Sequence, residues 1–404
     1  MAAMLTNTGC GDHNDASKKD KQPVATYARG SFGYDLDFLK SHDDLILLSD
    51  TAGEARVIVS AKYQGKVFTS TATGDQGKSF GWINYKAFEG PQNAHMNAYG
   101  GENRLWLGPE GGKYSLFFPK GAEMVFDHWK TPAAFDTEAW EVLSKNAQRV
   151  DLRKTMALTN YTGATLQLSI DRSVSLLSRD SIFSLLNLPA NDSLRAVGYE
   201  TQNKLTNTGA FAWDEKTGMP CIWMLDMFNP SEKAVILVPY ARASDTTTKI
   251  ATSNYFGQIP PERLKHADGL LYFRADGKQR GKLGLDPSRA TTFAGSYDPE
   301  NQVLTIAHFD FDPQAKYLNQ EWRTDRPTFS GDAVNAYNDG PLADGSQMGA
   351  FYEIESVSPA AGLKPGASLS HAHAVIHLTG PESALNEVTK QIFHVSIDQI
   401  KSAF

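Results

Sequence analysis

Short apolar runs separated by polar turn residues dominate the chain from Tyr34 onward. They are rich in β-branched and aromatic residues and are bounded by Gly, Pro, Asn and Asp, a pattern typical of β-strands. The runs cover residues 44–48, 55–61, 66–71, 114–118, 165–177, 221–228, 234–241, 270–275, 303–311, 349–357 and 368–378. Helical signals are few, with short helices expected near residues 35–40 and 136–143. Because no internal repeat or low-complexity linker interrupts residues 30–380, the pattern predicts an all-β chain in one large sandwich; a split into two domains is the alternative.

The end of the chain follows a helical period instead. Apolar residues spaced for one helix face are Leu385, Val388, Ile392 and Phe393. Thr379 with Glu382 matches a capping box ahead of this run, and Ser396 with Gln399 repeats the signal. We therefore expect short helices over residues 381–404, packed across the sheet edge of a sandwich domain that covers residues 25–380.

Residues 1–24 carry a different signal. A short apolar stub and small residues precede Cys10, and a polar tract runs from Asp12 to Gln22, which resembles the end of a bacterial lipoprotein signal followed by a tether. The departures are the lack of a basic segment before the stub and Asn7 at a position that usually holds Leu, Val or Ile. One hypothesis is a lipid anchor through Cys10 on an exported protein of the periplasm or outer membrane. The other is an ordinary disordered N-terminus.

Composition narrows the function classes. The net charge is −7 with no basic cluster, which argues against nucleic acid and large polyanions as partners. No run of 18 apolar residues is present, so no transmembrane helix is expected. Cys221 lies in the apolar run PCIWML and is expected to be a buried free thiol. The chain has no serine-hydrolase elbow, P-loop, dinucleotide fingerprint or zinc-protease motif, and we predict no cofactor.

The block YGGENRLWLGPEGG, residues 99–112, is the first candidate for binding chemistry. Its glycines indicate backbone that turns sharply or lies close to another group. Arg104 is suited to sugar hydroxyls or a carboxylate, and Trp106 to the apolar face of a sugar ring. Glu102 and Glu110 are expected to hold Arg104, and His95 just upstream completes the set. The alternative is a structural ion pair beneath a turn, with Trp106 in the core.

Two strand segments add candidate acids and bases. In SLSHAHAVIHL, His371, His373 and His377 share one strand face, which we expect to be open and to line a polar groove or to be solvated. We predict no metal there, because no acidic partner stands at ligand spacing. In FYEIE, Glu353 and Glu355 share a face, and two close carboxylates raise one pKa if partly buried.

A long polar and aromatic segment, residues 321–341, is the last candidate. Trp322, Asn338 and Asp339 combine a flat ring with a planar amide and a carboxylate, as sugar sites do. Other polar or aromatic residues in the segment are Arg323, Arg326, Asp332, Asn335 and Tyr337. NDGP is equally a turn signature. Lys282 and Asn203 are weaker candidates.

With these residues in view, the chain resembles the galactose mutarotase-like (aldose 1-epimerase-like) superfamily, in an exported bacterial branch. The likeness rests on residues 57–71, on 99–112, and on the closing strands of 351–378 with their L-x-P-G-x-S turn. It implies a β-supersandwich with a concave sugar-binding face, where a carboxylate takes the anomeric proton and an imidazole protonates the ring oxygen. By position Glu353 or Glu355 is the base and Arg104 binds hydroxyls.

The chain departs from that family in one respect. Aldose epimerases carry characteristic histidines mid-chain, and residues 140–260 contain none. His95 or His308 would have to supply the acid, although His308 alternates with apolar residues of its strand and is expected in the core. The main hypothesis is an epimerase-like or glycosidase-like enzyme acting at a sugar anomeric centre, and the alternative is a non-catalytic glycan-binding module. A lyase for acidic glycans is least favoured, because it would need a basic groove.

Overall fold

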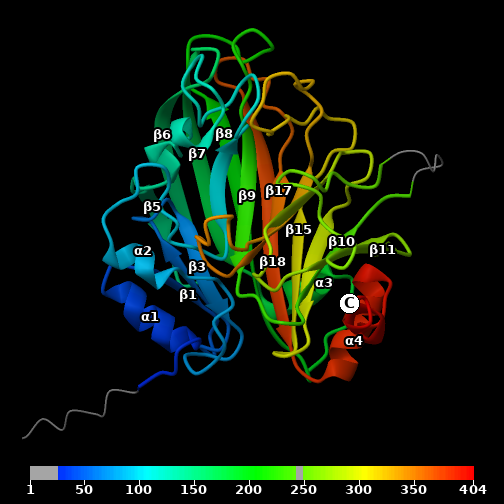
Figure 1. The fold of residues 1–404 in the computed structure, drawn as a ribbon. Coiled ribbons are helices and arrows are strands. Elements are labelled where there is room, and N and C mark those ends of the chain that lie inside the picture. Colours follow the sequence, from blue (N-terminus) through cyan, green and yellow to red (C-terminus); the bar gives the residue numbers. More distant parts are fainter. Residues whose placement is uncertain (1–25, 243–248) are drawn as a thin grey trace, which may run out of the picture.

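The computed structural model describes residues 26–242 and 249–404, and Figure 1 shows their arrangement. The strands form three antiparallel sheets, of ten, five and three strands. The predicted all-β supersandwich is confirmed, and short helices lie at its margins. Cys10 and the predicted tether of residues 1–24 lie outside the described residues and remain predictions.

The ten-stranded sheet forms one layer of the sandwich. Its order is β11-β12-β10-β14-β15-β18-β8-β7-β6-β5. In chain order the strands are β5 (Glu141–Lys145), β6 (Arg149–Thr159), β7 (Thr165–Leu176), β8 (Arg195–Asn207), β10 (Val235–Pro239), β11 (Leu264–Ala267), β12 (Leu270–Arg274), β14 (Phe293–Asp298), β15 (Val303–Phe309) and β18 (Ser368–Thr379).

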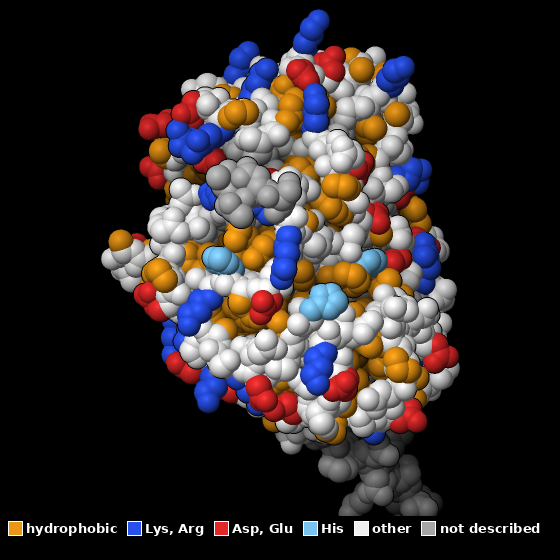
Figure 2. Space-filling view, turned by 90° about the vertical axis from the view of Figure 1, so that its right-hand side faces the viewer, with side chains coloured by type: hydrophobic (Ala, Val, Ile, Leu, Met, Phe, Trp, Pro, Cys, Tyr) orange, Lys and Arg blue, Asp and Glu red, His pale blue; other side chains and the backbone are white. Residues whose placement is uncertain are grey.

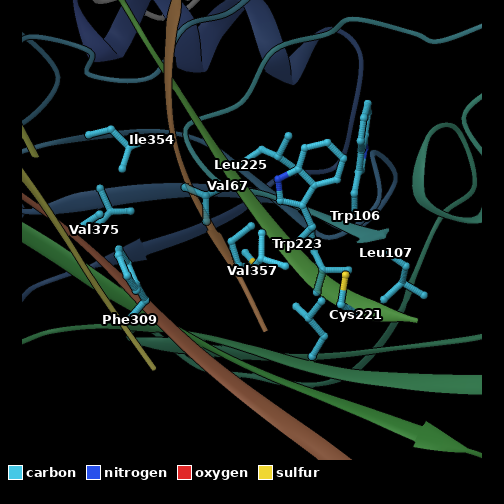
Figure 3. Packing of buried hydrophobic residues seen from close by; sticks show 14 of the residues in the cluster. Val67, Trp106, Leu107, Cys221, Trp223, Leu225, Phe309, Ile354, Val357 and Val375 are labelled. Atoms are coloured by element: carbon cyan, nitrogen blue, oxygen red, sulfur yellow. The ribbon is translucent and has the colours of Figure 1, made fainter. Parts of the chain in front are cut away.

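The five-stranded sheet packs against the inner face of the larger one. Its order is β13-β16-β17-β9-β4, built from β4 (Arg104–Gly108), β9 (Cys221–Phe228), β13 (Gly281–Leu285), β16 (Val334–Asn338) and β17 (Tyr352–Val357). Apolar residues of both sheets, among them Phe309, Val375 and Ile354, belong to one buried cluster (Figure 3). Cys221 is a buried free thiol, as predicted. Burying this cluster supplies the main favourable free energy of folding.

A small N-terminal layer extends the sandwich. It contains α1 (Phe32–Lys40) and α2 (Tyr85–Glu89) beside a three-stranded sheet of β1 (Ile46–Ser49), β2 (Arg56–Ser60) and β3 (Lys66–Thr71). A bridge between Val67 and Asn103 joins β3 to the start of β4. The helix predicted at residues 35–40 is confirmed within α1.

The remaining helices cover the outer face of the ten-stranded sheet. They are α3 (Arg179–Leu185), α4 (Glu382–Phe393) and α5 (Ile397–Lys401), and they share a buried cluster with Leu304, Ile306 and Ile376. The capping box of Ser396 and Gln399 is present. The one predicted at Thr379 is wrong, because β18 continues through that residue and Pro381 is the N-cap of α4.

Two local predictions are wrong. Residues 114–118 form no strand; their aromatic rings fill the core from an irregular loop, so burial rather than strand pairing explains the apolar run. Residues 136–143 form no helix, since the short 3-10 helix η2 (Ala133–Phe135) ends before Asp136 and β5 begins at Glu141. A second 3-10 helix, η1, covers Phe126–His128.

Charged side chains are dispersed on the face shown in Figure 2. Basic and acidic groups are interspersed around hydrophobic patches, and no continuous basic stripe crosses the described residues in this view. Within residues 26–242 and 249–404, no helix is both long and apolar enough to cross a membrane.

Candidate active site

The outward face of the five-stranded sheet gathers charged residues from distant parts of the chain. Residues directly opposite in an antiparallel pair point to the same face. The register therefore aligns Asn335, Glu355, Leu225 and Arg104 in one row across β16, β17, β9 and β4. A neighbouring row aligns Lys282, Tyr337, Glu353 and Met227. Both predicted carboxylates thus lie on one face with Arg104.

A cavity of about 690 Å³ opens over the β13 and β16 side of this face. Its charged and amide lining residues include Glu110, Arg280, Lys282, Glu321, Arg323, Arg326, Asp332, Asn335 and Asp339, and its aromatic ones Phe126, Tyr255, Phe256, Trp322 and Tyr337. A hollow of about 790 Å³ between α3, β10 and α4 contains none of the predicted site residues. The volume of the first cavity is typical of small-molecule sites.

Two ion pairs hold the carboxylates beside the cavity. Arg104 Nη2 donates to Glu353 Oε1 at 2.6 Å, and both side chains are less than a tenth exposed. Lys282 Nζ donates to Glu355 Oε2 at 2.9 Å, and the Trp223 indole donates to the same oxygen at 2.8 Å. Glu355 is fully buried, whereas Glu353 keeps a small exposed area. Of the two carboxylates only Glu353 keeps an exposed area, and neither belongs to the cavity lining itself.

Burial and neighbouring charges set the protonation of this cluster. Burial raises the pKa of Glu353 to about 7; Glu355 acts in the same direction and Arg104 opposes it. Burial also raises the pKa of Glu110, against the attraction of Lys282. Burial alone would lower the pKa of Lys282, but Glu355 and Glu110 outweigh it and the net shift is upward. The face thus holds one carboxyl group, Glu353, that exchanges a proton near neutral pH, beside a lysine whose charged form is stabilised.

Two tyrosine–aspartate pairs line the cavity wall. The Tyr255 hydroxyl donates to Asp332, and burial raises the pKa of Asp332 to about 6. The Tyr337 hydroxyl donates to Asp339 at 2.7 Å, and burial raises the pKa of Asp339. Tyr255 comes from a loop that is fixed to the sheet edge by a bridge between residues 252 and 284.

Asp332→Asn is expected to change how stability depends on pH. The folded pKa of Asp332, about 6, exceeds its ordinary value of 3.8, so the folded carboxyl keeps a proton that the unfolded one has lost. Its contribution to stability is complete below pH ~4 and is lost as pH rises through ~6, a change on the order of 2–3 kcal/mol. The variant should lack this part of the decline. Urea unfolding at pH 4, 5, 6 and 7 measures it, with the exposed Asp127→Asn as control; parallel curves for Asp332→Asn and wild type would contradict the assignment.

Aromatic and apolar side chains frame the polar cavity. Trp322 stacks on Trp129 with ring centroids 5.9 Å apart. Among the described residues, half of the exposed large hydrophobic side chains line this one cavity: Phe126, Phe256, Leu342 and Met348, each 42–58% exposed. Exposed apolar groups gathered around a polar floor are typical of a ligand site.

The glycine block brings Trp322 to the cavity. The amide of Gly111 donates to Gln320 O at 3.1 Å, and a Cβ at Gly111 would stand 2.1 Å from Glu321 O. Only glycine permits this approach. The first motif and the 321–341 segment thus meet at the cavity, a contact that the sequence did not predict.

Several predicted residues lie between the sheets instead. His371, His373 and Glu102 are fully buried, so the expected open histidine face is wrong. His373 hydrogen-bonds Asp226 at 2.6 Å, and Ser356 contacts both His371 and His373 at 2.8 Å. The face of β18 that carries these histidines packs against the five-stranded sheet. Strand periodicity shows that the histidines share a face, but not that this face is the buried one.

Glu102 does not hold Arg104. It accepts hydrogen bonds from Ser70 at 2.7 Å and is 3.0 Å from His377 Nε2, on the inner side of the sheet. Glu110 lines the cavity near Lys282 rather than pairing with Arg104. Glu353 is the actual partner of Arg104.

Trp106 and Asn338 are also placed away from the cavity lining. Trp106 is 5% exposed, beneath the Arg104 guanidinium and 5.6 Å from Trp223, whose ring lies beside it in Figure 3. Its alternative assignment to the core is therefore correct. Asn338 points away from Tyr337, donates to Gln279 O at 2.9 Å, and stabilises the turn before β13.

Neither catalytic histidine candidate reaches the carboxylates. His308 lies on the other sheet, on the face that packs against the C-terminal helices, with its ring 4.7 Å from Phe293. His95 stacks on Phe126 at 4.6 Å and its Nδ1 is 2.6 Å from Trp129 O, so it lies one ring behind the cavity wall. Among the residues described, none of the cavity lining is histidine, and no cluster of three or more His, Cys, Asp or Glu suited to a metal is found.

The sequence missed or undervalued three cavity residues. Arg280 and Tyr255 were not candidates, and Lys282 was a weak one. The available signal was the alternation in GKLGL, which places Lys282 on the face opposite to Leu283 and Leu285. Asn203, the other weak candidate, is buried between the sheets.

The fold and cavity define a large β-sandwich protein with a polar pocket on its smaller sheet. The chain belongs to a family whose model matches residues 30–404 and is described as "Family of unknown function (DUF6786)". No curated protein matches the sequence.

Several solved structures resemble the chain. The Slr1438 protein of Synechocystis sp. PCC 6803 matches with a TM-score of 0.53 at 14% identity, covering 89% of this chain and 100% of that one. A putative aldose 1-epimerase from Escherichia coli K12 has a TM-score of 0.46 at 14% identity, over 83% and 99%. A galactose mutarotase-like protein from Lactobacillus casei ATCC 334 has 0.46 at 11%, over 82% and 99%. At 14% identity, the likeness to the Slr1438 protein shows a shared fold and nothing beyond it.

Proposed function

We propose that the cavity binds a sugar and that the protein transfers protons at its anomeric centre, as an epimerase-like or glycosidase-like enzyme. The observation that carries the proposal is Glu353, a slightly exposed carboxyl with a pKa of about 7 that is held by Arg104 and lies in register with the cavity-lining Tyr337. A group that titrates near the working pH is suited to general acid–base catalysis.

The chemistry needs one base at the anomeric hydroxyl and one acid at the ring oxygen, on opposite sides of C1. In anomer exchange, the ionised Glu353 takes the proton of the anomeric hydroxyl while the C1–O5 bond breaks. The electron pair of that bond goes to O5, which receives a proton from a neutral carboxyl. Glu110 and Asp332, whose pKa values are raised by burial, are the candidates for this acid. Carboxyl groups thus replace the imidazole that the sequence led us to seek.

The rest of the lining is suited to sugar recognition. Trp322 and Phe256 offer flat apolar faces, and Asn335 and Asp339 offer hydrogen-bonding groups for hydroxyls. Arg104 and Lys282 are already paired with carboxylates, so their main role is to position the acid–base groups.

A panel of reducing sugars and aryl glycosides tests the proposal. We expect at least one reducing sugar to show faster α/β exchange in magnetisation-transfer NMR, or one glycoside to be cleaved, with binding of the same sugar in calorimetry. The proposal would be wrong if α/β exchange ran at the uncatalysed rate for every reducing sugar, no glycoside were cleaved, and no sugar bound in calorimetry.

A non-catalytic glycan-binding module is the second candidate. It is favoured by the absence of histidine from the described cavity lining and by the exposed apolar side chains at the mouth. Binding in calorimetry without anomer exchange or cleavage would select this function over the first.

A further inference from the structure

The basic residues around the cavity differ in whether a carboxylate neutralises them. Lys282 pairs with Glu355 at 2.9 Å, Arg323 with Asp325 at 2.5 Å, and Arg326 with Glu321 at 3.5 Å. Arg280 is the exception: within residues 26–242 and 249–404 it has no carboxylate partner within 4 Å. A half-buried guanidinium left without a counterion at a cavity wall is available to a ligand.

Two contacts hold the Arg280 fork in one orientation. Its Nε donates to the Tyr337 hydroxyl at 3.1 Å, and its guanidinium carbon stands 3.7 Å from the centre of the Phe256 ring. Because Tyr337 in turn donates to Asp339, the hydroxyl is itself fixed. Arginine has five N–H donors, and only the Nε–H is occupied by the described residues. The two terminal nitrogens are therefore presented as a rigid pair, the geometry that binds a carboxylate or phosphate with two hydrogen bonds.

We infer that Arg280 forms an anion subsite and that the substrate is a sugar carrying one acidic group, a carboxylate or a phosphate. This inference rests on the proposed sugar-binding function and specifies its substrate class. Stacking on Phe256 preorganises the fork, so little entropy is lost on binding.

The surroundings restrict the ligand to a single acidic group. Glu110, Asp332 and Asp339 lie in the same cavity, and the other basic groups are neutralised. A polyanion would place further negative charges beside these acidic side chains, and their repulsion would weaken its binding. The net charge of −7, which argued against large polyanions, is therefore compatible with one charged sugar.

Matched sugar pairs test the subsite. Calorimetry compares D-glucuronate and D-glucose 6-phosphate with D-glucose, and D-galacturonate and D-galactose 6-phosphate with D-galactose, on wild type and on Arg280→Gln. We expect one charged sugar to bind wild type about tenfold or more tightly than its neutral counterpart, and Arg280→Gln to remove that preference while keeping neutral-sugar affinity. If the sugar carboxylate binds more tightly than its neutral counterpart, the acidic group is a carboxylate; if the sugar phosphate does, it is a phosphate.

Two further variants control the measurement. Arg274 is a matched arginine away from the cavity. Its guanidinium stacks on the Phe404 ring at 4.5 Å, and its Nε donates to a backbone carbonyl, so Arg274→Gln is the control variant. It should leave the preference intact. Arg280→Lys keeps the charge without the fork and should retain only part of the preference; thermal unfolding checks that each variant folds.

The outcomes separate the two proposals. Equal affinity of charged and neutral sugars for wild type overturns the anion subsite and leaves sugar binding standing. A preference that survives in Arg280→Gln also overturns it, because the charge would then be recognised elsewhere. No binding of any sugar overturns both.

Discussion

Glu353→Gln should lower the rate of anomer exchange or glycoside cleavage by about 10²–10⁴-fold and change sugar affinity little. The amide has nearly the shape of the carboxyl, but it cannot take up a proton near pH 7, as Glu353 can. The loss should therefore fall on kcat rather than on KM. Turnover of the best substrate of the panel, followed by NMR, provides the measurement. The wild-type rate should also rise as the pH increases through about 7, because the ionised form of Glu353 is the base. The residual activity of the variant should lack this rise.

The control is a more exposed carboxylate in an ion pair away from the cavity. Glu138 pairs with Lys154 at 2.6 Å, and Glu138→Gln should leave turnover unchanged. Because Glu353→Gln also leaves Arg104 without its charged partner, thermal unfolding must accompany the kinetics. A folded Glu353→Gln variant with wild-type kcat would exclude Glu353 as the proton carrier.

Asp226→Ala should be among the most destabilising single changes, lowering the free energy of unfolding by about 3–5 kcal/mol. Asp226 is fully buried between the sheets, 2.6 Å from His373 Nε2 and 2.7 Å from Asn103 Nδ2. Truncation leaves both buried donors without their acceptor, which costs the desolvation free energy of each. Urea unfolding measures the change.

An exposed aspartate provides the comparison. Asp171 accepts from Arg153 at 2.5 Å, with the two side chains 31% and 46% exposed. Asp171→Ala should cost about 0–1 kcal/mol, because water screens the pair in both states. Similar losses for Asp171→Ala and Asp226→Ala would show that burial of the inter-sheet network does not strengthen it.

That network also explains why the histidine prediction was wrong. Arg172 donates to Asn103 at 2.5 Å, Asn103 to Asp226, and the chain continues through His373 and Ser356. From the sequence, three alternating histidines in SHAHAVIH indicated a solvated face, since polar residues usually face water. Here His371 and His373 find hydrogen-bond partners on the opposite sheet, which allows the face to be buried. A few polar atoms, such as His371 Nδ1, have no partner among the described residues.

The glycine block and the FYEIE strand meet through the Arg104–Glu353 ion pair. Arg104 and Glu353 were both named, and their common location was expected from a resemblance rather than from spacing. The partner of Arg104 was misjudged, because Glu102 and Glu110 are close in sequence whereas Glu353 is 249 residues away. No sequence pattern indicated a binding role for Arg280. That role is inferred only from its contacts with Phe256 and Tyr337 in the structure.

By itself the sequence determined the local part of this protein. Its period of two set the strands and placed Glu353 and Glu355 on one face, and its helical period set the helices at the end of the chain. These properties depend on neighbouring residues. The tertiary structure alone decided which strand face meets water, which carboxylate pairs with Arg104, and which arginine of the described cavity lining has no carboxylate partner. These depend on strand register and sheet packing between segments hundreds of residues apart, where burial and electrostatics act through space rather than along the chain.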